Sequence, residues 1–248
     1  MNARPLERRR ALVTGASGGI GGAVAWALAG AGAELVLTYS SHRRDAEAAA
    51  RSVRETGSAE PHVIQADLSA PDAGRRLARQ VADDIGNIDV LVANAGVGRQ
   101  LRWDEVDDET WNSTFAVNVT SAWQLTQGLL PAMIERSFGR VLFVSSIAAL
   151  TGGLIGPHYA ASKAALHGLV HHLAGQVAGD GVTVNALAPA LIEDTRIMPA
   201  TPQDGTARPI PVGRPGRPDE VAAMALSIVT NAYLTNKVIT LDGGLHPT

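Results

Sequence analysis

Short runs of apolar residues alternate with longer amphipathic stretches along almost the whole chain. The runs predict strands at residues 10–14, 34–39, 62–65, 89–93, 140–145, 182–187 and 237–241. The stretches predict helices at residues 19–31, 43–56, 71–85, 107–130, 158–177 and 218–230. Continuously apolar strands are typical of a parallel sheet that is buried on both faces. We therefore expect one α/β domain over residues 1–248, a doubly wound Rossmann-type fold with about seven parallel strands.

One long segment, residues 189–217, lies outside this alternation. It contains six prolines and follows the carboxyl end of a predicted strand. Ligands of open α/β sheets bind beyond the carboxyl ends of the strands, and loops there carry many binding residues. We therefore predict a substrate lid over residues 189–217, with a plain surface loop as the alternative.

Composition excludes several classes of function. The net charge of −3 gives no electrostatic reason to expect a nucleic acid or an anionic membrane as partner. Because the chain has no cysteine, it has no disulfide and no thiolate metal site. No apolar run approaches the roughly 18 residues of a membrane span, and the amino terminus lacks a signal-peptide pattern. We expect a cytoplasmic protein.

The first candidate chemistry lies on the predicted helix at residues 158–177. Tyr159 and Lys163 are four residues apart, so they share one face of that helix. An ammonium beside a phenol stabilises the phenolate, and we therefore expect the pKa of Tyr159 to fall. Such a phenol can donate or accept a proton near neutral pH. Together with the Ser146 hydroxyl, the pair predicts an acid–base site for an alcohol and its carbonyl.

A glycine-rich turn, TGASGGIG, occupies residues 14–21, between the first predicted strand and the first predicted helix. This is the context that a phosphate-binding turn requires. We expect Gly15 to permit the tight turn, Gly19 to let the backbone approach a pyrophosphate, and Gly21 to allow close helix packing. The amino end of the helix then offers free N–H groups to the phosphates.

Five motifs in this order resemble the short-chain dehydrogenase/reductase family: the glycine turn, Asn94-Ala95-Gly96, Asn118, Ser146 and the Tyr159–Lys163 pair. The resemblance covers nearly the whole chain. It implies that Tyr159 is the general acid and base, that Lys163 lowers its pKa and holds the nicotinamide ribose, and that Ser146 orients the substrate oxygen. Asn118 would hold a water that links Lys163 to solvent. Ser146 is preferred to Ser145 because the family's serine stands thirteen residues before the tyrosine.

The same resemblance implies a nicotinamide cofactor bound along the carboxyl edge of the sheet. The expected cofactor-binding residues are Gly15, Ser17, Gly18, Gly19, Ile20, Gly21, Tyr39, Ser40, Ser41, Arg43, Asp67, Leu68, Asn94, Ala95, Gly96, Tyr159, Lys163, Pro189, Ile192 and Thr195.

The end of the second predicted strand indicates which cofactor is bound. A carboxylate there would accept from the ribose 2′-hydroxyl of NAD, but no carboxylate occurs before Asp45. The hydroxyls of Ser40 and Ser41 and the guanidinium of Arg43 suit a 2′-phosphate better. NADP(H) is therefore favoured over NAD(H), although Gly18 stands where many NADPH-using relatives carry a basic residue.

In length and layout the chain is similar to the 3-oxoacyl-carrier-protein reductase branch of the family. The resemblance implies NADPH-dependent reduction of a ketone, such as a 3-oxoacyl thioester, to a secondary alcohol. Oxidation of a secondary alcohol or sugar is the alternative, and a nucleotide-sensing regulator is a third. An acyl carrier protein would meet few basic residues, since residues 178–181 read AGDG and only Arg136 and Arg140 stand near the other expected contact. By resemblance we expect a homotetramer or homodimer.

We predict no metal site. His167 and His171 share a helix face at a spacing that can bind zinc, but the sequence offers no evident third ligand.

Overall fold

The computed structural model describes residues 4–197 and 209–247. Its strands are β1 (Arg10–Val13), β2 (Glu34–Tyr39), β3 (His62–Gln65), β4 (Val90–Ala93), β5 (Gly139–Val144), β6 (Val182–Pro189) and β7 (Lys237–Leu241). Its helices are α1 (Gly19–Gly30), α2 (Arg43–Glu55), α3 (Ala73–Asp84), α4 (Asp108–Phe115), α5 (Ser121–Glu135), α6 (Ala148–Thr151), α7 (Pro157–Val177) and α8 (Pro218–Thr230). A π-helical turn, η1 (Ala116–Thr120), joins α4 to α5, and a 3-10 turn, η2 (Ala178–Asp180), follows α7.

All seven strands lie parallel in one sheet, in the order β3-β2-β1-β4-β5-β6-β7. Strand β1 pairs with β2 on one side and β4 on the other, so that Leu12 stands between Val36 and Leu91. Strands β2 and β3 follow on one side of β1, and β4 to β7 follow on the other side. The connecting helices therefore lie on opposite faces of the sheet, which leaves a crevice beyond the carboxyl ends of β1 and β4. The predicted fold class is confirmed.

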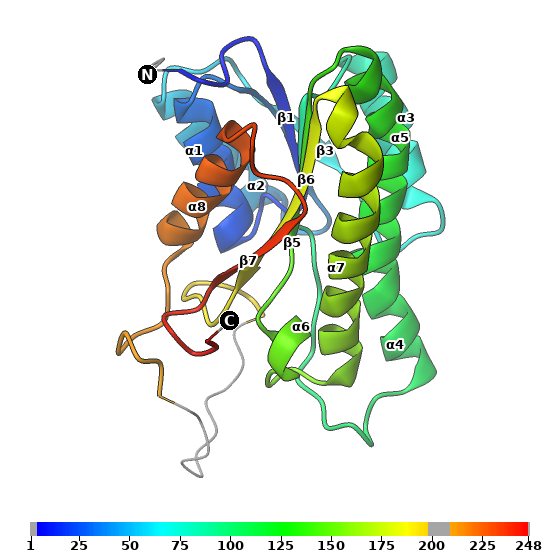
Figure 1. The fold of residues 1–248 in the computed structure, drawn as a ribbon, viewed down its shortest axis with the longest axis vertical. Coiled ribbons are helices and arrows are strands. Elements are labelled where there is room, and N and C mark those ends of the chain that lie inside the picture. Colours follow the sequence, from blue (N-terminus) through cyan, green and yellow to red (C-terminus); the bar gives the residue numbers. More distant parts are fainter. Residues whose placement is uncertain (1–3, 198–208, 248) are drawn as a thin grey trace.

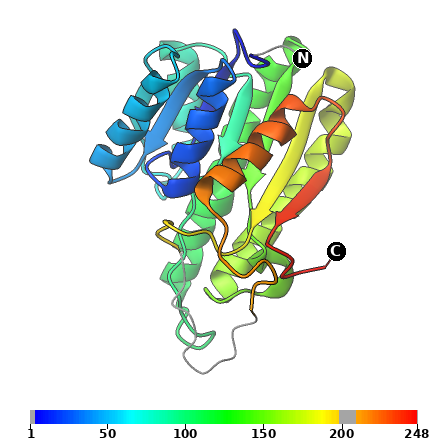
Figure 2. The ribbon, with the colours of Figure 1, turned by 90° about the vertical axis from the view of Figure 1, so that its left-hand side faces the viewer.

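Helices cover both faces of the sheet. Helices α1, α2 and α8 lie on one face, and α3, α4, α5 and α7 lie on the other (Figures 1 and 2). Each layer has its own core, since the side chains of successive strand residues alternate between the faces. Val13 and Leu37 pack with α1 and α8, whereas Leu12 and Leu91 pack with α5 and α7. Burial of such a side chain stabilises the fold by about 1.5–3 kcal/mol.

The predicted helix at residues 107–130 differs from the structure. Asp107 caps α4 by accepting from the Thr110 N–H at 2.8 Å, as expected of an N-cap. The helical path then widens into η1 and continues to Glu135, five residues past the predicted end. Pro131 lies inside α5 on its exposed side, where the loss of one intrahelical N–H does not end the helix.

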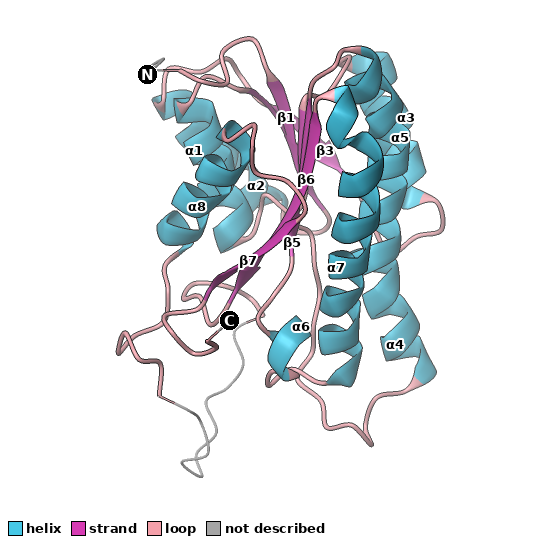
Figure 3. Cartoon of the chain, in the orientation of Figure 1, coloured by secondary structure: helices cyan, strands magenta, loops and turns pink. Residues whose placement is uncertain are grey.

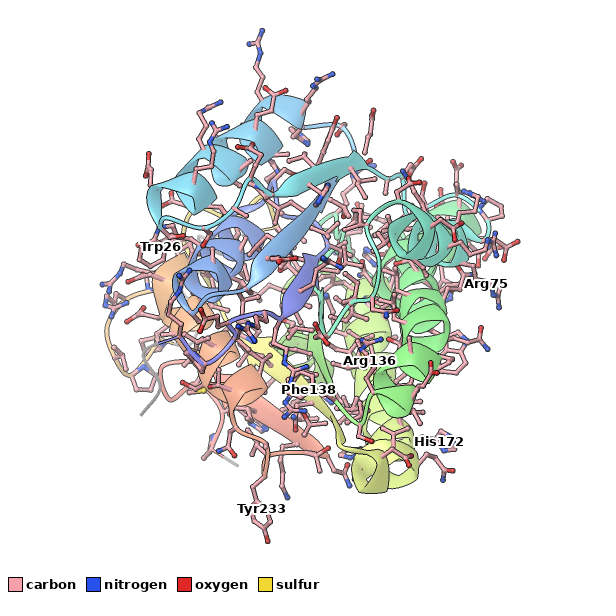
Figure 4. All side chains as sticks on the ribbon, turned by 90° about the horizontal axis from the view of Figure 1, so that it is seen from above. Trp26, Arg75, Arg136, Phe138, His172 and Tyr233 are labelled. Atoms are coloured by element: carbon pink, nitrogen blue, oxygen red, sulfur yellow. The ribbon has the colours of Figure 1, made fainter. Side chains whose placement is uncertain are left out.

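The amino edge of the sheet is held by an ion-pair network around Asp89. The Asp89 carboxylate accepts from the backbone N–H of Arg10 at 2.9 Å and lies 3.4 Å from Arg9 and 3.5 Å from Arg136. Arg9 also covers the ring of Phe138, which Figure 4 shows beside Arg136 in the view from above. The arginine run before β1 therefore fastens neighbouring loops at the edge opposite the crevice. None of the described helices combines the length and apolar character that a membrane span would need.

Candidate active site

A single continuous cavity of about 1310 Å³ opens along the carboxyl edge of the sheet. At one end it is lined by the glycine turn and by the residues that follow β2, and at the other by Ser146, Tyr159 and Ile197. The loops that build it meet at the lower end of the sheet, next to α6 (Figure 3). This volume is large enough to hold a dinucleotide and a small substrate together.

The glycine turn has the backbone geometry that its sequence predicts. Gly15 has φ 67°, a left-handed conformation that glycine adopts without steric cost. A Cβ on Gly21 would lie 2.4 Å from the Gly15 carbonyl oxygen, so only glycine allows α1 to start this close to the turn. The N-cap residue Gly18 supplies no side-chain hydrogen bond to α1. The first N–H groups of α1 are therefore left for an anionic ligand, and the turn fits a pyrophosphate.

The turn is tied to the loop after β4 across the crevice. Thr14 Oγ1 accepts from the backbone N–H groups of Asn94 and Ala95, both at 3.0 Å. The Asn94 side-chain amide donates in return to the carbonyls of Thr14 and Gly15, at 2.9 and 3.2 Å. These four contacts fix the separation of the two loops, which sets the width of the cavity.

Gly19 has a further role that the sequence did not indicate. A Cβ there would lie 2.6 Å from the carbonyl oxygen of Asp194, in the predicted lid. The absent side chain therefore lets residues 192–197 cross directly over the start of α1. Residues 198–208 of the predicted lid lie outside the described part of the chain.

Tyr159, Ser146 and Lys163 meet at the other end of the cavity. Helix α7 begins at Pro157, whose fixed φ suits a first helical position, and it presents Tyr159 and Lys163 on its buried face. The Ser146 hydroxyl, in the loop after β5, hydrogen-bonds the Tyr159 hydroxyl. The Lys163 ammonium donates to the Val144 carbonyl at 2.8 Å and lies 5.7 Å from the centre of the Tyr159 ring.

The electrostatics of this pair differ from the sequence expectation. Burial raises the pKa of Tyr159 above its usual value, and the hydrogen bond from Ser146 opposes that rise. Burial lowers the pKa of Lys163 from 10.5 to about 8. The expected fall in the Tyr159 pKa is therefore wrong for the chain itself, because both groups lie away from water and the ammonium is held by a carbonyl. The tyrosine stays protonated at neutral pH.

Asn118 lies in the π turn, behind the wall of the cavity. Its side-chain oxygen accepts from the Val97 N–H at 2.8 Å, and its amide donates to the Val97 carbonyl and the Ser162 hydroxyl, both at 2.9 Å. A Cβ on Gly96 would lie 3.1 Å from Lys163 Nζ and 3.5 Å from Asn118 Oδ1. The bare backbone of Gly96 thus lets Asn118 and Lys163 approach each other. The proton-relay role of Asn118 stays a prediction.

The two neighbouring serines have different partners. The Ser145 hydroxyl donates to the Lys163 carbonyl at 3.0 Å and lies 2.8 Å from His167 Nε2, inside the protein. Ser146 instead reaches Tyr159 in the cavity. This arrangement agrees with the choice of Ser146 as the serine that contacts substrate.

All but one of the predicted cofactor residues line the cavity. Arg43 is the exception: its guanidinium pairs with Glu47 one helical turn later, at 2.8 Å, and its side chain is 75% exposed. In this structure the first turn of α2 directs the Arg43 side chain along the helix surface, and its contact with the cofactor stays a prediction. Arg196, which the sequence analysis did not single out, lines the cavity instead.

The sequence analysis also missed most of the wall around Tyr159. A Cβ on Gly98 would lie 2.6 Å from Tyr159 Cδ2 and 3.0 Å from Ile155 Cγ2, so this glycine makes room for the ring. A second glycine shortly after Asn94-Ala95-Gly96 was the signal that could have indicated it. Further wall residues come from α4, η1, α6, the loop after α6 and the segment after β7: Thr110, Ser113, Thr114, Val117, Leu150, Thr151, Leu154, Leu245 and His246.

The two histidines of α7 with zinc-like spacing, His167 and His171, have partners of their own. His167 pairs with Ser145, and His171 Nδ1 lies 2.7 Å from Asn236 Oδ1. Among the residues that the structure describes, no group of three or more potential ligands could hold a metal ion.

Comparisons with known proteins agree with this architecture. The short chain dehydrogenase family model matches residues 9–205. The 3-oxoacyl-[acyl-carrier-protein] reductase of Escherichia coli is 32% identical over 245 residues, which cover 97% of this chain and 98% of that protein.

Two solved structures share the fold over nearly the whole chain. A 3-oxoacyl (acyl-carrier-protein) reductase from Agrobacterium tumefaciens with NADP bound has a TM-score of 0.88 and 34% identity, covering 96% of this chain and 95% of that one. An acetoin dehydrogenase from Salmonella typhimurium has a TM-score of 0.85 and 29% identity, covering 95% of each chain. The chain belongs to the short chain dehydrogenase family and is an NAD(P)-dependent oxidoreductase that acts on CH–OH and C=O groups.

Proposed function

We propose that this enzyme reduces a ketone, such as a 3-oxoacyl thioester or a similar small carbonyl compound, to a secondary alcohol with NADPH. Tyr159 acts as the general acid. The observation that carries the proposal is the contact of Ser146 with Tyr159 in the same cavity as the glycine turn. The end with Ser146 and Tyr159 suits a carbonyl group, and the end with the glycine turn suits a dinucleotide.

The chain's own residues account for the proton in this reaction. When bound, the nicotinamide supplies the hydride. The Tyr159 hydroxyl donates its proton to the carbonyl oxygen, and the Ser146 hydroxyl donates a hydrogen bond to the same oxygen, which stabilises the charge that develops there. Tyr159 then recovers a proton from solvent, which passes first through the relay at Asn118 and then through Lys163 Nζ.

At neutral pH, Tyr159 is in the protonation state that reduction requires. Burial raises its pKa, so the phenol is in the acid form that reduction requires at neutral pH. Oxidation of a secondary alcohol needs the phenolate as base, and it is the second candidate because one structural relative is an acetoin dehydrogenase. The two directions share one site and differ in the pH that suits them.

The cofactor residues fit NADP(H). Tyr39, Ser40 and Ser41 line the cavity where the second strand ends, and no carboxylate intervenes before Asp45. A relative that shares the fold has NADP bound.

The two arginines near the expected carrier-protein contact, Arg136 and Arg140, are both held by contacts within the fold. Arg140 is only 7% exposed and donates to the carbonyls of Gly139 and Gly181, and Arg136 is held by the Ile88 carbonyl and Asp89. Neither side chain is presented as a free surface cation to an acidic carrier protein. A small ketone or free thioester is therefore the favoured substrate, and a carrier protein is the weaker proposal. A homotetramer or homodimer in the cytoplasm stays a prediction.

The test is Tyr159→Phe, measured as NADPH oxidation with a panel of acetoacetyl thioesters, diketones and cyclic ketones. We expect the wild-type enzyme to turn over one of these classes and the variant to lose at least about a hundredfold in kcat while still binding cofactor. Undiminished turnover in the variant would show that Tyr159 is not the acid. Equal or better kcat/KM with NADH would contradict the cofactor preference.

A further inference from the structure

We propose that Arg196 binds the 2′-phosphate of NADP(H), and that Asp45 holds the Arg196 guanidinium when no cofactor is present. The inference rests on the proposed NADPH-dependent function and assigns the cation that selects the phosphate. It concerns an ion pair between Arg196, which lines the cavity, and Asp45 in the first turn of α2, 151 positions apart in the chain.

The backbone that carries Arg196 is fixed in place. The Glu193 N–H donates to the Gly216 carbonyl at 2.9 Å, and the Gly216 N–H donates to the Leu191 carbonyl at 2.9 Å. Thr195 Oγ1 donates to the Ile192 carbonyl at 2.8 Å. On the other side, the Asp194 carbonyl lies against Gly19. These contacts place Arg196 directly beside the glycine turn.

The Arg196 guanidinium reaches from this position to the first turn of α2. There it forms an ion pair with the Asp45 carboxylate. Helix α2 begins just after Ser40 and Ser41, whose exposed hydroxyls line the same end of the cavity. The guanidinium, the two hydroxyls and the amino end of α2 therefore face one small region, where the end of β2 places the adenosine ribose.

Charge along the cavity points to the same residue. Among the described residues that line the cavity, the lysine and arginine side chains are Arg99, Lys163 and Arg196. Arg99 and Lys163 stand at the Tyr159 end, next to Gly98 and Val144. The glycine turn offers Gly18 and no basic residue, and Arg43 pairs with Glu47 on the helix surface. Arg196 is thus the lining guanidinium at the nucleotide end.

The exchange of Asp45 for a phosphate is physically reasonable. The side chains of Arg196 and Asp45 are 46% and 53% exposed, and ion pairs between such exposed side chains are weak. A phosphate dianion offers a guanidinium two parallel, charge-assisted hydrogen bonds, which are stronger. Asp45 is exposed enough to stay hydrated once the guanidinium leaves it. NAD(H) has no such phosphate, so the ion pair with Asp45 would persist in its presence.

The experiment measures binding of two nucleotide fragments, 2′,5′-ADP and 5′-ADP, by calorimetry, so that its result does not depend on turnover. We expect Arg196→Gln to weaken 2′,5′-ADP binding roughly tenfold to a hundredfold, the effect of losing charge-assisted hydrogen bonds, and to change 5′-ADP binding less than about twofold. Arg51→Gln, on the exposed side of α2, removes the same charge away from the cavity and should leave both affinities unchanged.

Asp45→Asn separates direct phosphate binding from mere neutralisation of Asp45. If Arg196 contacts the phosphate, Asp45→Asn tightens 2′,5′-ADP binding, and the double variant with Arg196→Gln remains as weak as Arg196→Gln alone. Recovery of wild-type affinity in the double variant would mean that Arg196 only masks a repelling carboxylate, which would overturn the proposal. An equal loss of affinity for both fragments in Arg196→Gln would overturn it as well.

Failure of this inference is distinguishable from failure of the proposed function. If the wild-type chain binds neither fragment and neither reduced cofactor, the NADPH-dependent function is wrong. If it binds 2′,5′-ADP and Arg196→Gln binds it equally well, the function stands and the assignment of Arg196 is wrong.

Discussion

The buried ammonium of Lys163 gives a prediction about stability that does not depend on knowing the substrate. Its pKa of about 8, against an ordinary 10.5, corresponds to about 3 kcal/mol at about 1.4 kcal/mol per pKa unit. This is the free energy by which burial disfavours the charged form at neutral pH. Within residues 4–197 and 209–247, the ammonium donates a hydrogen bond to the Val144 carbonyl alone.

The sign follows from proton binding. The unfolded chain holds a proton on Lys163 up to pH 10.5, whereas the folded chain releases it near pH 8. Between these values the unfolded state binds more protons, so the free energy of unfolding rises with pH. A variant with Lys163→Met has no such proton. The stability of the lysine form relative to the methionine form should therefore increase by about 3 kcal/mol between pH 7.5 and pH 10.5.

The measurement needs a background in which Tyr159 cannot titrate, because its phenol ionises near pH 10 in the unfolded chain, burial raises its pKa in the folded chain, and the two groups are neighbours. We therefore compare Tyr159→Phe with Tyr159→Phe/Lys163→Met by urea unfolding at several pH values. The hydrogen bond to Val144 that Lys163→Met loses changes the stability difference between the two variants by a constant. It does not change how that difference varies with pH. A stability difference that stays flat over this pH range would refute the conclusion that the Lys163 ammonium is costly to bury.

Three further outcomes follow from the site. Gly98→Ala should lower kcat by about a hundredfold, because the added Cβ would lie 2.6 Å from the Tyr159 ring. The control Gly175→Ala, at an exposed position of α7, should leave kcat unchanged and stabilise the fold by about 0.5–1 kcal/mol. Steady-state kinetics measure kcat, and urea unfolding measures the stability of both variants. Ser146→Ala should lower kcat by about a hundredfold with little change in the free energy of unfolding. Ser145→Ala should destabilise the fold by about 1–2 kcal/mol, because it loses the contact with the Lys163 carbonyl, and should keep most of kcat. If the two effects were reversed, Ser145 and not Ser146 would be the serine that contacts substrate. The rate of reduction should fall as pH rises above about 8, where Lys163 loses its charge, and the reverse oxidation should rise with pH as Tyr159 ionises; a reduction rate that climbs from pH 8 to pH 10 would contradict these roles.

The fold could be predicted from the sequence because its signals are local and repeated. The continuous apolar runs at β1, β4, β5 and β6 indicate strands buried on both faces, and each is followed by a helix that must return over the sheet. The glycine turn could be placed for the same reason, since its meaning depends on the strand before it and the helix after it. The pair of Tyr159 and Lys163 needed only the period of a helix.

Other features depend on contacts that no local pattern contains. The widening of the helix at Asn118 depends on Val97, which lies 21 positions earlier, and the direction of the Tyr159 pKa depends on burial by the folded chain. The position of Arg196 in the cavity wall depends on the path of residues 192–197 over Gly19. In each case the deciding partner is distant in sequence, and the side chain's own neighbours suggest a different outcome.

The π turn at Ala116–Thr120 has a consequence for how this site can change. The Ser121 N–H donates to the Ala116 carbonyl, five positions back, so the helix accommodates one residue more than a regular turn would. Each residue of an α-helix advances by about 100°, and that extra residue rotates the faces of α4 relative to those of α5. Removing a single codon in this turn would restore a regular helix and turn Asn118 away from Val97. The position of Asn118 is thus set by chain length, and it is vulnerable to a deletion that would leave the glycine turn, Ser146, Tyr159 and Lys163 unaltered in sequence.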